Sequence, residues 1–139
     1  MSQKTFTAQL GAFRDKTVEQ MRAVLSASVQ DVMDEAQKPE AQGGRMPVDT
    51  GFLRNSLVSE LNGAQIGQGA TSYLLATTAI QPGDVARFGW TAAYALRMEA
   101  GFVGEDKLGR TYNQAGRHFV EAAALQWDRI VQANIARLK

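Results

Sequence analysis

Hydrophobic positions in the first third of the chain recur at intervals of three and four residues. They are Phe6, Leu10, Phe13, Met21, Val24 or Leu25, Val32 and Ala36, with Thr17 and Ser28 at the intervening steps of the same face. This spacing places apolar side chains on one face of a helix, and charged residues mostly occupy the other. Pro39 ends the pattern, because the residue before a proline disfavours the helical conformation. The pattern therefore predicts one long helix over residues 4–37.

The middle of the chain has shorter hydrophobic runs separated by turn signals such as Asn62-Gly63. Positions in these runs alternate with a period of two, as in a strand with one buried face. In the last run, Ala86, Phe88 and Trp90 share a face. We expect strands at about 57–61, 72–80 and 85–91. Short strands joined by tight turns favour an antiparallel sheet, here of three to four strands.

The last quarter again has helical spacing, with an apolar stripe at Val120, Ala124, Trp127, Val131, Ile135 and Leu138. It predicts a second long helix over 114–138, and short helices are expected near 50–56 and 92–100. Residues 101–116 contain four glycines and little apolar area, so a flexible loop is expected there. We predict one α+β domain over 1–139, with two long terminal helices packed on the central antiparallel sheet.

Asp49 precedes the short helix expected at 50–56. An aspartate there accepts hydrogen bonds from the free N–H groups of the first helical turn, so Asp49 is the predicted N-cap. Val48 and Leu53 lie one before and four after it, which is the spacing of a hydrophobic staple across a helix start.

Composition and charge exclude several classes of protein. Fifteen Lys and Arg against 14 Asp and Glu give a formal charge of +1, without the basic face typical of nucleic-acid binders. The absence of cysteine excludes disulfides and thiolate sites and suits a reducing compartment. The longest uncharged run, Leu61 to Gly83, is rich in Gly, Gln, Ser and Thr, so no membrane helix is expected.

Asp49-Thr50-Gly51 is the best catalytic candidate, because dimeric aspartic proteases use this triplet. The glycine-rich segment before it is a poor strand, and a three-residue match is common by chance, so we favour the helix-cap interpretation. His118 is the only histidine and has no nucleophile motif near it. We therefore predict a protein that is not an enzyme, with no catalytic, cofactor-binding or metal-binding residues and no cofactor.

Two segments carry a more specific signal. Pro47-Val48-Asp49-Thr50-Gly51-Phe52-Leu53-Arg54-Asn55-Ser56 resembles the characteristic segment of the tail-completion (tail-to-head joining, neck) proteins of long-tailed bacteriophages. About forty residues later, Tyr94-Ala95-Leu96-Arg97-Met98-Glu99-Ala100-Gly101 resembles the second segment of that family. The order of the expected elements is also similar over nearly the whole chain. The loop after Gly101 departs from the pattern, because it lacks the prolines expected before the last helix.

The resemblance implies a structural virion protein without a cofactor. It would be made in the cytoplasm of a host bacterium and form a ring, of six subunits, at the head-proximal end of the phage tail. Its partners would be the tail tube or tail terminator protein and the head-side stopper or connector protein. DNA would pass through the lumen without specific binding, and no membrane would be involved.

The resemblance also marks structural or interface positions. They are Pro47, Val48, Asp49, Thr50, Gly51, Leu53, Arg54, Ser56, Tyr94, Glu99 and Gly101. Arg54 is expected to pair with Asp49 or with a neighbouring subunit, and Tyr94 and Glu99 to fix the second segment. Alternatives are a tail terminator or other neck ring protein, a prophage protein that serves as an interaction module and, from another class, the aspartic protease.

Overall fold

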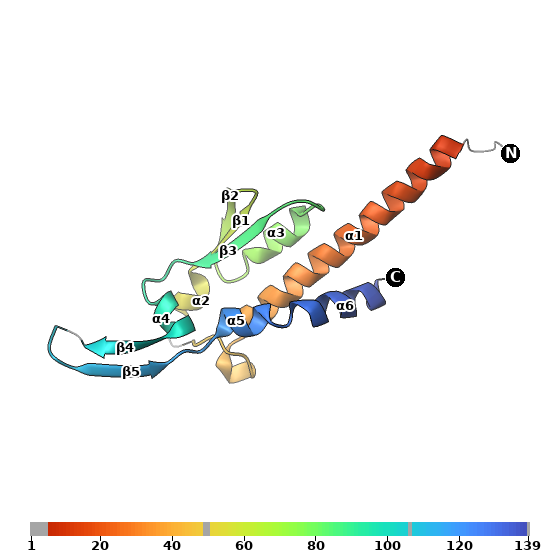
Figure 1. Cartoon of the computed structure of the whole chain (residues 1–139). Coiled ribbons are helices and arrows are strands. Elements are labelled where there is room, and N and C mark those ends of the chain that lie inside the picture. Colours follow the sequence, from red (N-terminus) through yellow and green to blue (C-terminus); the bar gives the residue numbers. More distant parts are fainter. Residues whose placement is uncertain (1–5, 49–50, 106, 139) are drawn as a thin grey trace.

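A computed structural model describes residues 6–48, 51–105 and 107–138 of the chain. The molecule is elongated, with the N-terminal half of helix α1 projecting at one end and the β4–β5 hairpin at the other (Figure 1). Helix α1 spans Phe6–Gln37, which confirms the first predicted helix over the part that the structure describes. Its C-terminal half lies against the rest of the protein, whereas residues 12 to 21 are all exposed.

The sheet has three antiparallel strands in the order β2-β1-β3. They are β1 (Leu57–Leu61), β2 (Ala64–Gln68) and β3 (Ala86–Trp90). Asn62 and Gly63 join β1 to β2 with φ angles of 53° and 85°, as a tight hairpin turn requires. In β3, alternate residues are half-buried, as its period of two predicted. The predicted α+β class is confirmed.

The predicted strand at 72–80 is wrong, because this segment contains helix α3, Tyr73–Ala79. Its buried residues Tyr73, Ala76, Thr77 and Ile80 are three and four positions apart. A short apolar run fits a buried strand or a buried helix equally well, so its pattern alone does not decide between them. The third strand is instead β2, which the pattern missed because its Ala and Gly residues are poor strand formers.

The expectation of a loop without regular structure at 101–116 is also wrong, because the segment forms a hairpin of β4 (Gly101–Glu105) and β5 (Thr111–Ala115). The two strands pair from Gly101 opposite Ala115 to Glu105 opposite Thr111. The guanidinium of Arg97 lies 4.0 Å from the centre of the Phe102 ring, which packs the base of the hairpin against α4. The four glycines of residues 101–116 interrupt the alternation of apolar and polar residues that would have predicted these strands.

The predicted helix at 114–138 is two helices, α5 (Phe119–Ala124) and α6 (Trp127–Arg137), separated at Leu125 and Gln126. Its first residues belong to β5. The two short helices are present but shorter than predicted, as α2 (Phe52–Asn55) and α4 (Ala95–Ala100). A one-turn 3₁₀ helix, Glu40–Gln42, follows α1.

Two clusters of buried side chains form the core, and Trp90 contacts both. In one, Met33 of α1 packs on Leu57 and Tyr73, so that α1 contacts the sheet and α3. In the other, Leu53 of α2 and Phe119 of α5 pack together with Met46 and Ala92. Helices α5 and α6 in turn lie along α1. No helix among the described residues is long and apolar enough to cross a membrane.

Candidate functional site

The described parts of two sequence segments, residues 47–56 and 94–101, lie side by side in the structure. The rings of Phe52 and Tyr94, one from each segment, have their centres 6.1 Å apart. Leu53 of the first segment is 2% exposed, and its cluster includes Ala95 and Met98 of the second. Because 37 residues lie between the segments, their contact is a tertiary feature that brings α2, α4 and α5 together. We call this region the motif junction.

Gln37, the last residue of α1, connects the helix to this junction and is only 1% exposed. Its side-chain oxygen accepts a 2.8 Å hydrogen bond from the Trp90 indole N–H. Its side-chain nitrogen donates to the backbone carbonyls of Arg54, at 3.0 Å, and Ala70, at 2.9 Å. One buried amide therefore satisfies three polar groups from β3, α2 and the segment before α3.

Arg54 binds the end of α1. Its Nε donates a 2.8 Å hydrogen bond to the backbone carbonyl of Gln37, and the side chain is partly buried. A cation at this position stabilises the negative end of the helix dipole and satisfies a carbonyl that lacks a partner within the helix. This contact within the chain was not expected from the sequence, and the expected partner Asp49 lies outside the described residues.

The start of α2 differs from the prediction. Gly51 is the N-cap residue, with a left-handed φ of 84°, so the right-handed helix begins only at Phe52. Asp49 and Thr50 lie outside the described residues. The roles considered for Asp49, as a helix cap or as a catalytic group, therefore stay predictions. The expected staple is wrong, since Val48 is 46% exposed whereas Leu53 is buried in the core. Pro47, just before Val48, is half-buried.

Ser56 closes the first segment. Its hydroxyl donates a 2.7 Å hydrogen bond to the carbonyl of Leu53, which ends α2. Its own carbonyl accepts a 3.1 Å hydrogen bond from the backbone N–H of Thr91, just after β3. The first segment is thereby tied to the chain that leads into Tyr94.

Glu99 binds the start of α5. Its two carboxylate oxygens accept hydrogen bonds of 2.9 Å from the backbone N–H groups of Val120 and Glu121. These are among the first N–H groups of the helix, which have no partner within it. The backbone carbonyl of Glu99 also accepts a 3.1 Å hydrogen bond from the N–H of His118. Glu99 is thus a helix cap supplied by a different helix, and it connects the second segment to α5.

Gly101 follows at a point where two backbones nearly touch. Its φ is 89°, and a Cβ at this position would lie 2.8 Å from both the Gln114 carbonyl oxygen and the Gly116 nitrogen. A Cβ at Gly116 would lie 2.5 Å from the carbonyl oxygen of Glu99. Both positions require glycine, because the chain leaving the hairpin packs directly on the chain entering it. The resemblance marked Gly101 but not Gly116.

Glu99, His118 and Glu121 also form a group of possible metal ligands, with ligand atoms within 4.8 Å of one another. The sequence did not predict that these three side chains lie close together. Both oxygens of Glu99 already accept N–H groups, and His118 Nδ1 lies 3.1 Å from a Glu121 carboxylate oxygen. The side chains of His118 and Glu121 are 46% and 62% exposed. We therefore interpret this group as a helix cap, because the hydrogen bonds of Glu99 to the start of α5 already explain its position.

Replacing Glu99 by alanine is expected to lower the free energy of unfolding by about 1–2 kcal/mol, the upper part of the range for a lost cap. Glu99→Gln should cost less, because one oxygen still accepts an N–H. Denaturant unfolding measures both values. Glu19→Ala, on the exposed face of α1, is the control and should change stability little. Equal effects of Glu99→Ala and Glu19→Ala would contradict the cap.

Comparison of the chain with protein-family models, with curated proteins and with solved structures found no match.

Proposed function

We propose that this chain is a structural protein of a bacteriophage neck. It assembles as a ring, a hexamer, at the head-proximal end of the tail and joins the tail to the head. The observation that supports this function best is the motif junction. The two segments that resemble tail-completion proteins, far apart in sequence, pack on each other at Phe52 and Tyr94 and share one hydrophobic cluster.

The contacts of these segments support a structural role and not a catalytic one. The described polar side chains of the segments mostly bind backbone groups: Arg54 binds the end of α1, Ser56 closes α2 and Glu99 caps α5. Such bonds hold helix ends at fixed positions. An assembly protein needs rigid surfaces in fixed relation, and the motif junction supplies them by joining α1, α2, α4 and α5.

In this proposal, one side of the ring contacts the tail tube or tail terminator protein and the other contacts the head-side stopper or connector protein. The protein is part of the virion and is made in the host cytoplasm. The formal charge of +1 suits a lumen through which DNA passes, because a cluster of phosphate-binding cations would retard the DNA.

Deleting the gene from the phage that encodes it should leave DNA-filled heads and complete tails as separate particles. Electron microscopy of the lysate measures this, and adding the purified protein should restore joined particles. Joined particles in the absence of the gene would refute the proposal. Tails of abnormal length would instead identify a tail terminator, which is the alternative within the same neck.

A further inference from the structure

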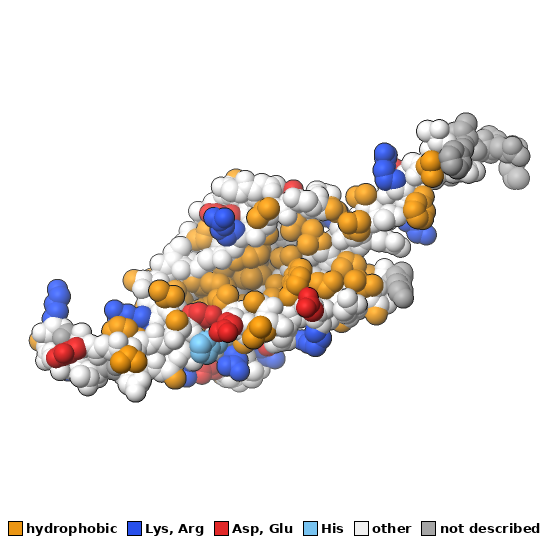
Figure 2. Space-filling model, in the orientation of Figure 1, with side chains coloured by type: hydrophobic (Ala, Val, Ile, Leu, Met, Phe, Trp, Pro, Cys, Tyr) orange, Lys and Arg blue, Asp and Glu red, His pale blue; other side chains and the backbone are white. Residues whose placement is uncertain are grey.

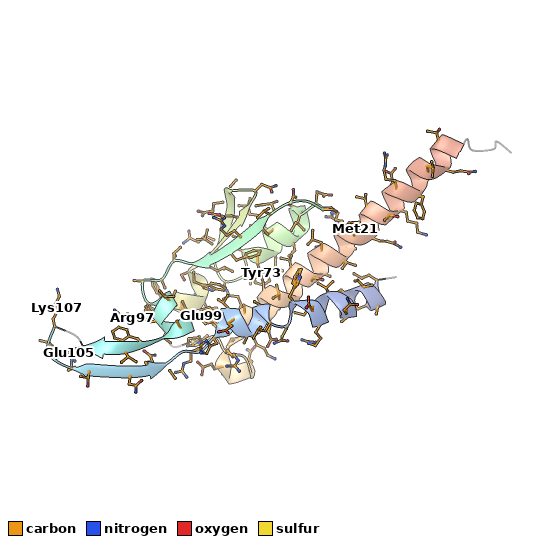
Figure 3. The ribbon with its side chains drawn as sticks, in the orientation of Figure 1. Met21, Tyr73, Arg97, Glu99, Glu105 and Lys107 are labelled. Carbon is orange, nitrogen blue, oxygen red and sulfur yellow. The ribbon has the colours of Figure 1, made fainter. Side chains whose placement is uncertain are left out.

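The projecting half of α1 carries an apolar stripe that nothing in the described chain covers. Leu10, Phe13 and Met21 are 52%, 70% and 55% exposed. Their spacing of three to eight residues places them on the same side of the helix. Met21 lies where α1 leaves the body of the protein (Figure 3). Ordinary surface helices bury such a stripe, so this one is a candidate for contact with another molecule.

The stripe leads into an apolar groove of about 390 Å³ between α1 and α6. Met21, Val24 and Leu25 line it from α1, opposite Trp127, Val131, Ile135 and Leu138 near the C-terminus. Hydrophobic side chains gather along this hollow in Figure 2. Met21 belongs to both the stripe and the groove. They therefore form one continuous surface, which we call the α1–α6 face.

The positions of this face are symmetric about Thr17. Leu10 and Val24 each lie seven residues from Thr17, and Phe13 and Met21 each lie four residues from it. A second α1, antiparallel and related by a two-fold axis at Thr17, would place its Leu10 on Val24 and its Phe13 on Met21. The same contact would then form twice, which is the property of an interface between identical subunits related by two-fold symmetry.

We propose that two copies of this chain pair through the α1–α6 face, with the projecting half of each α1 lying in the groove of the other copy. Thr17 suits the crossing point, because it is small and its hydroxyl already donates a 2.9 Å hydrogen bond to the Phe13 carbonyl of its own helix. Burial of Thr17 therefore leaves no unpaired hydroxyl.

The positions of the charged residues near the face favour an uncharged, apolar partner. Arg14 lies at the edge of the stripe, and its guanidinium is 3.3 Å from the Asp15 carboxylate. On a helix of 3.6 residues per turn, Asp15 and Glu19 lie on the side opposite Thr17. The stripe therefore offers no cationic cluster to a nucleic acid and no acidic cluster to a basic peptide. A second copy of the same face matches it in both polarity and length.

The size of the face also fits a pair of subunits. The exposed parts of Leu10, Phe13, Met21, Trp127 and Ile135, doubled across a two-fold axis, amount to on the order of 1,000 Å². That is the area at which specific protein interfaces begin. The inference goes beyond the proposed function and concerns the free protein, because neighbouring subunits of a cyclic ring are not related by two-fold axes. Its test needs neither heads nor tails, so the two can fail separately.

The chain has no cysteine, so a single introduced cysteine reports on one position. Under mild oxidation, Thr17→Cys should form a disulfide-linked dimer rapidly, because the axis places both Cα atoms within the roughly 4.4–6.8 Å that a disulfide spans. Glu19→Cys, on the opposite side of the same helix, is the control and should cross-link slowly. Sedimentation should give a dimer mass for the unmodified protein and a monomer mass for Phe13→Glu.

Circular dichroism of Phe13→Glu should show unchanged helix content, which separates loss of pairing from loss of folding. A monomeric unmodified protein, with Thr17→Cys no faster than Glu19→Cys, would overturn the proposal. A larger oligomer that depends on Phe13 but shows no Thr17 cross-link would also overturn it, since the face would then bind a different surface of the neighbour.

Discussion

Phe119→Ala is expected to lower the free energy of unfolding by about 3–5 kcal/mol, the usual cost of removing a buried phenylalanine ring. Phe119 is 2% exposed and packs with Met46, Leu53 and Ala92 at the motif junction. Its ring also makes an edge-to-face contact with the Trp90 ring, with ring centres 5.1 Å apart and planes at 83°. Because a domain of this size has a stability of only about 5–15 kcal/mol, the loss is a large part of the total.

Chemical denaturation monitored by circular dichroism measures the loss. Leu125→Ala is the matched control, because Leu125 lies between α5 and α6 yet is 79% exposed. It should change stability by less than about 0.5 kcal/mol. If the two substitutions cost the same, Phe119 does not pack as described.

Gln37→Leu is expected to cost about 2–5 kcal/mol, although leucine is similar in size. The substitution removes the partner of the Trp90 indole N–H and of the Arg54 and Ala70 carbonyls. A buried polar group that loses its partner costs about 1–3 kcal/mol, and not all three can rebind water. Gln42→Leu, at an exposed position in the 3₁₀ helix, is the control and should be nearly neutral.

A double-mutant cycle with Trp90→Phe tests the hydrogen bond itself. Phenylalanine has no N–H, so Gln37→Leu should cost less in the Trp90→Phe background than in the unmodified protein. Strict additivity of the two substitutions would show that the bond between Gln37 and Trp90 contributes nothing to stability. The Arg54 and Ala70 carbonyls would then account for the whole effect of Gln37→Leu.

The sequence predicted elements whose pattern is long or regular. Helix α1 was predicted correctly because its apolar spacing extends over eight turns and ends at Pro39. The sequence also predicted that Phe88 and Trp90 of β3 lie on the same, partly buried face of the strand. Helix α3 and the β4–β5 hairpin were not, because seven- and five-residue segments rich in Ala, Thr or Gly carry little periodicity.

The motif junction could be predicted only in part. The resemblance marked Leu53, Arg54 and Glu99, but it did not indicate the contacts of Arg54 with Gln37 or of Glu99 with the start of α5. Their partners depend on contacts between distant positions: Gln37 is 17 positions from Arg54 and 53 positions from Trp90 in the sequence. No local pattern distinguishes Gln37 from an ordinary glutamine at the end of a helix. The same holds for Gly116, whose need for glycine follows from the approach of Glu99.

The β4–β5 hairpin is fixed at its base on both strands. Gly101 and Gly116 bring the strands' ends together, and the backbone N–H groups of Arg117 and His118 bond to the carbonyls of Met98, at 2.7 Å, and Glu99, at 3.1 Å. The hairpin therefore has no loose hinge where it leaves the body. We therefore expect a load on the hairpin to be carried by α4 and α5, and then by α1, against which α5 packs.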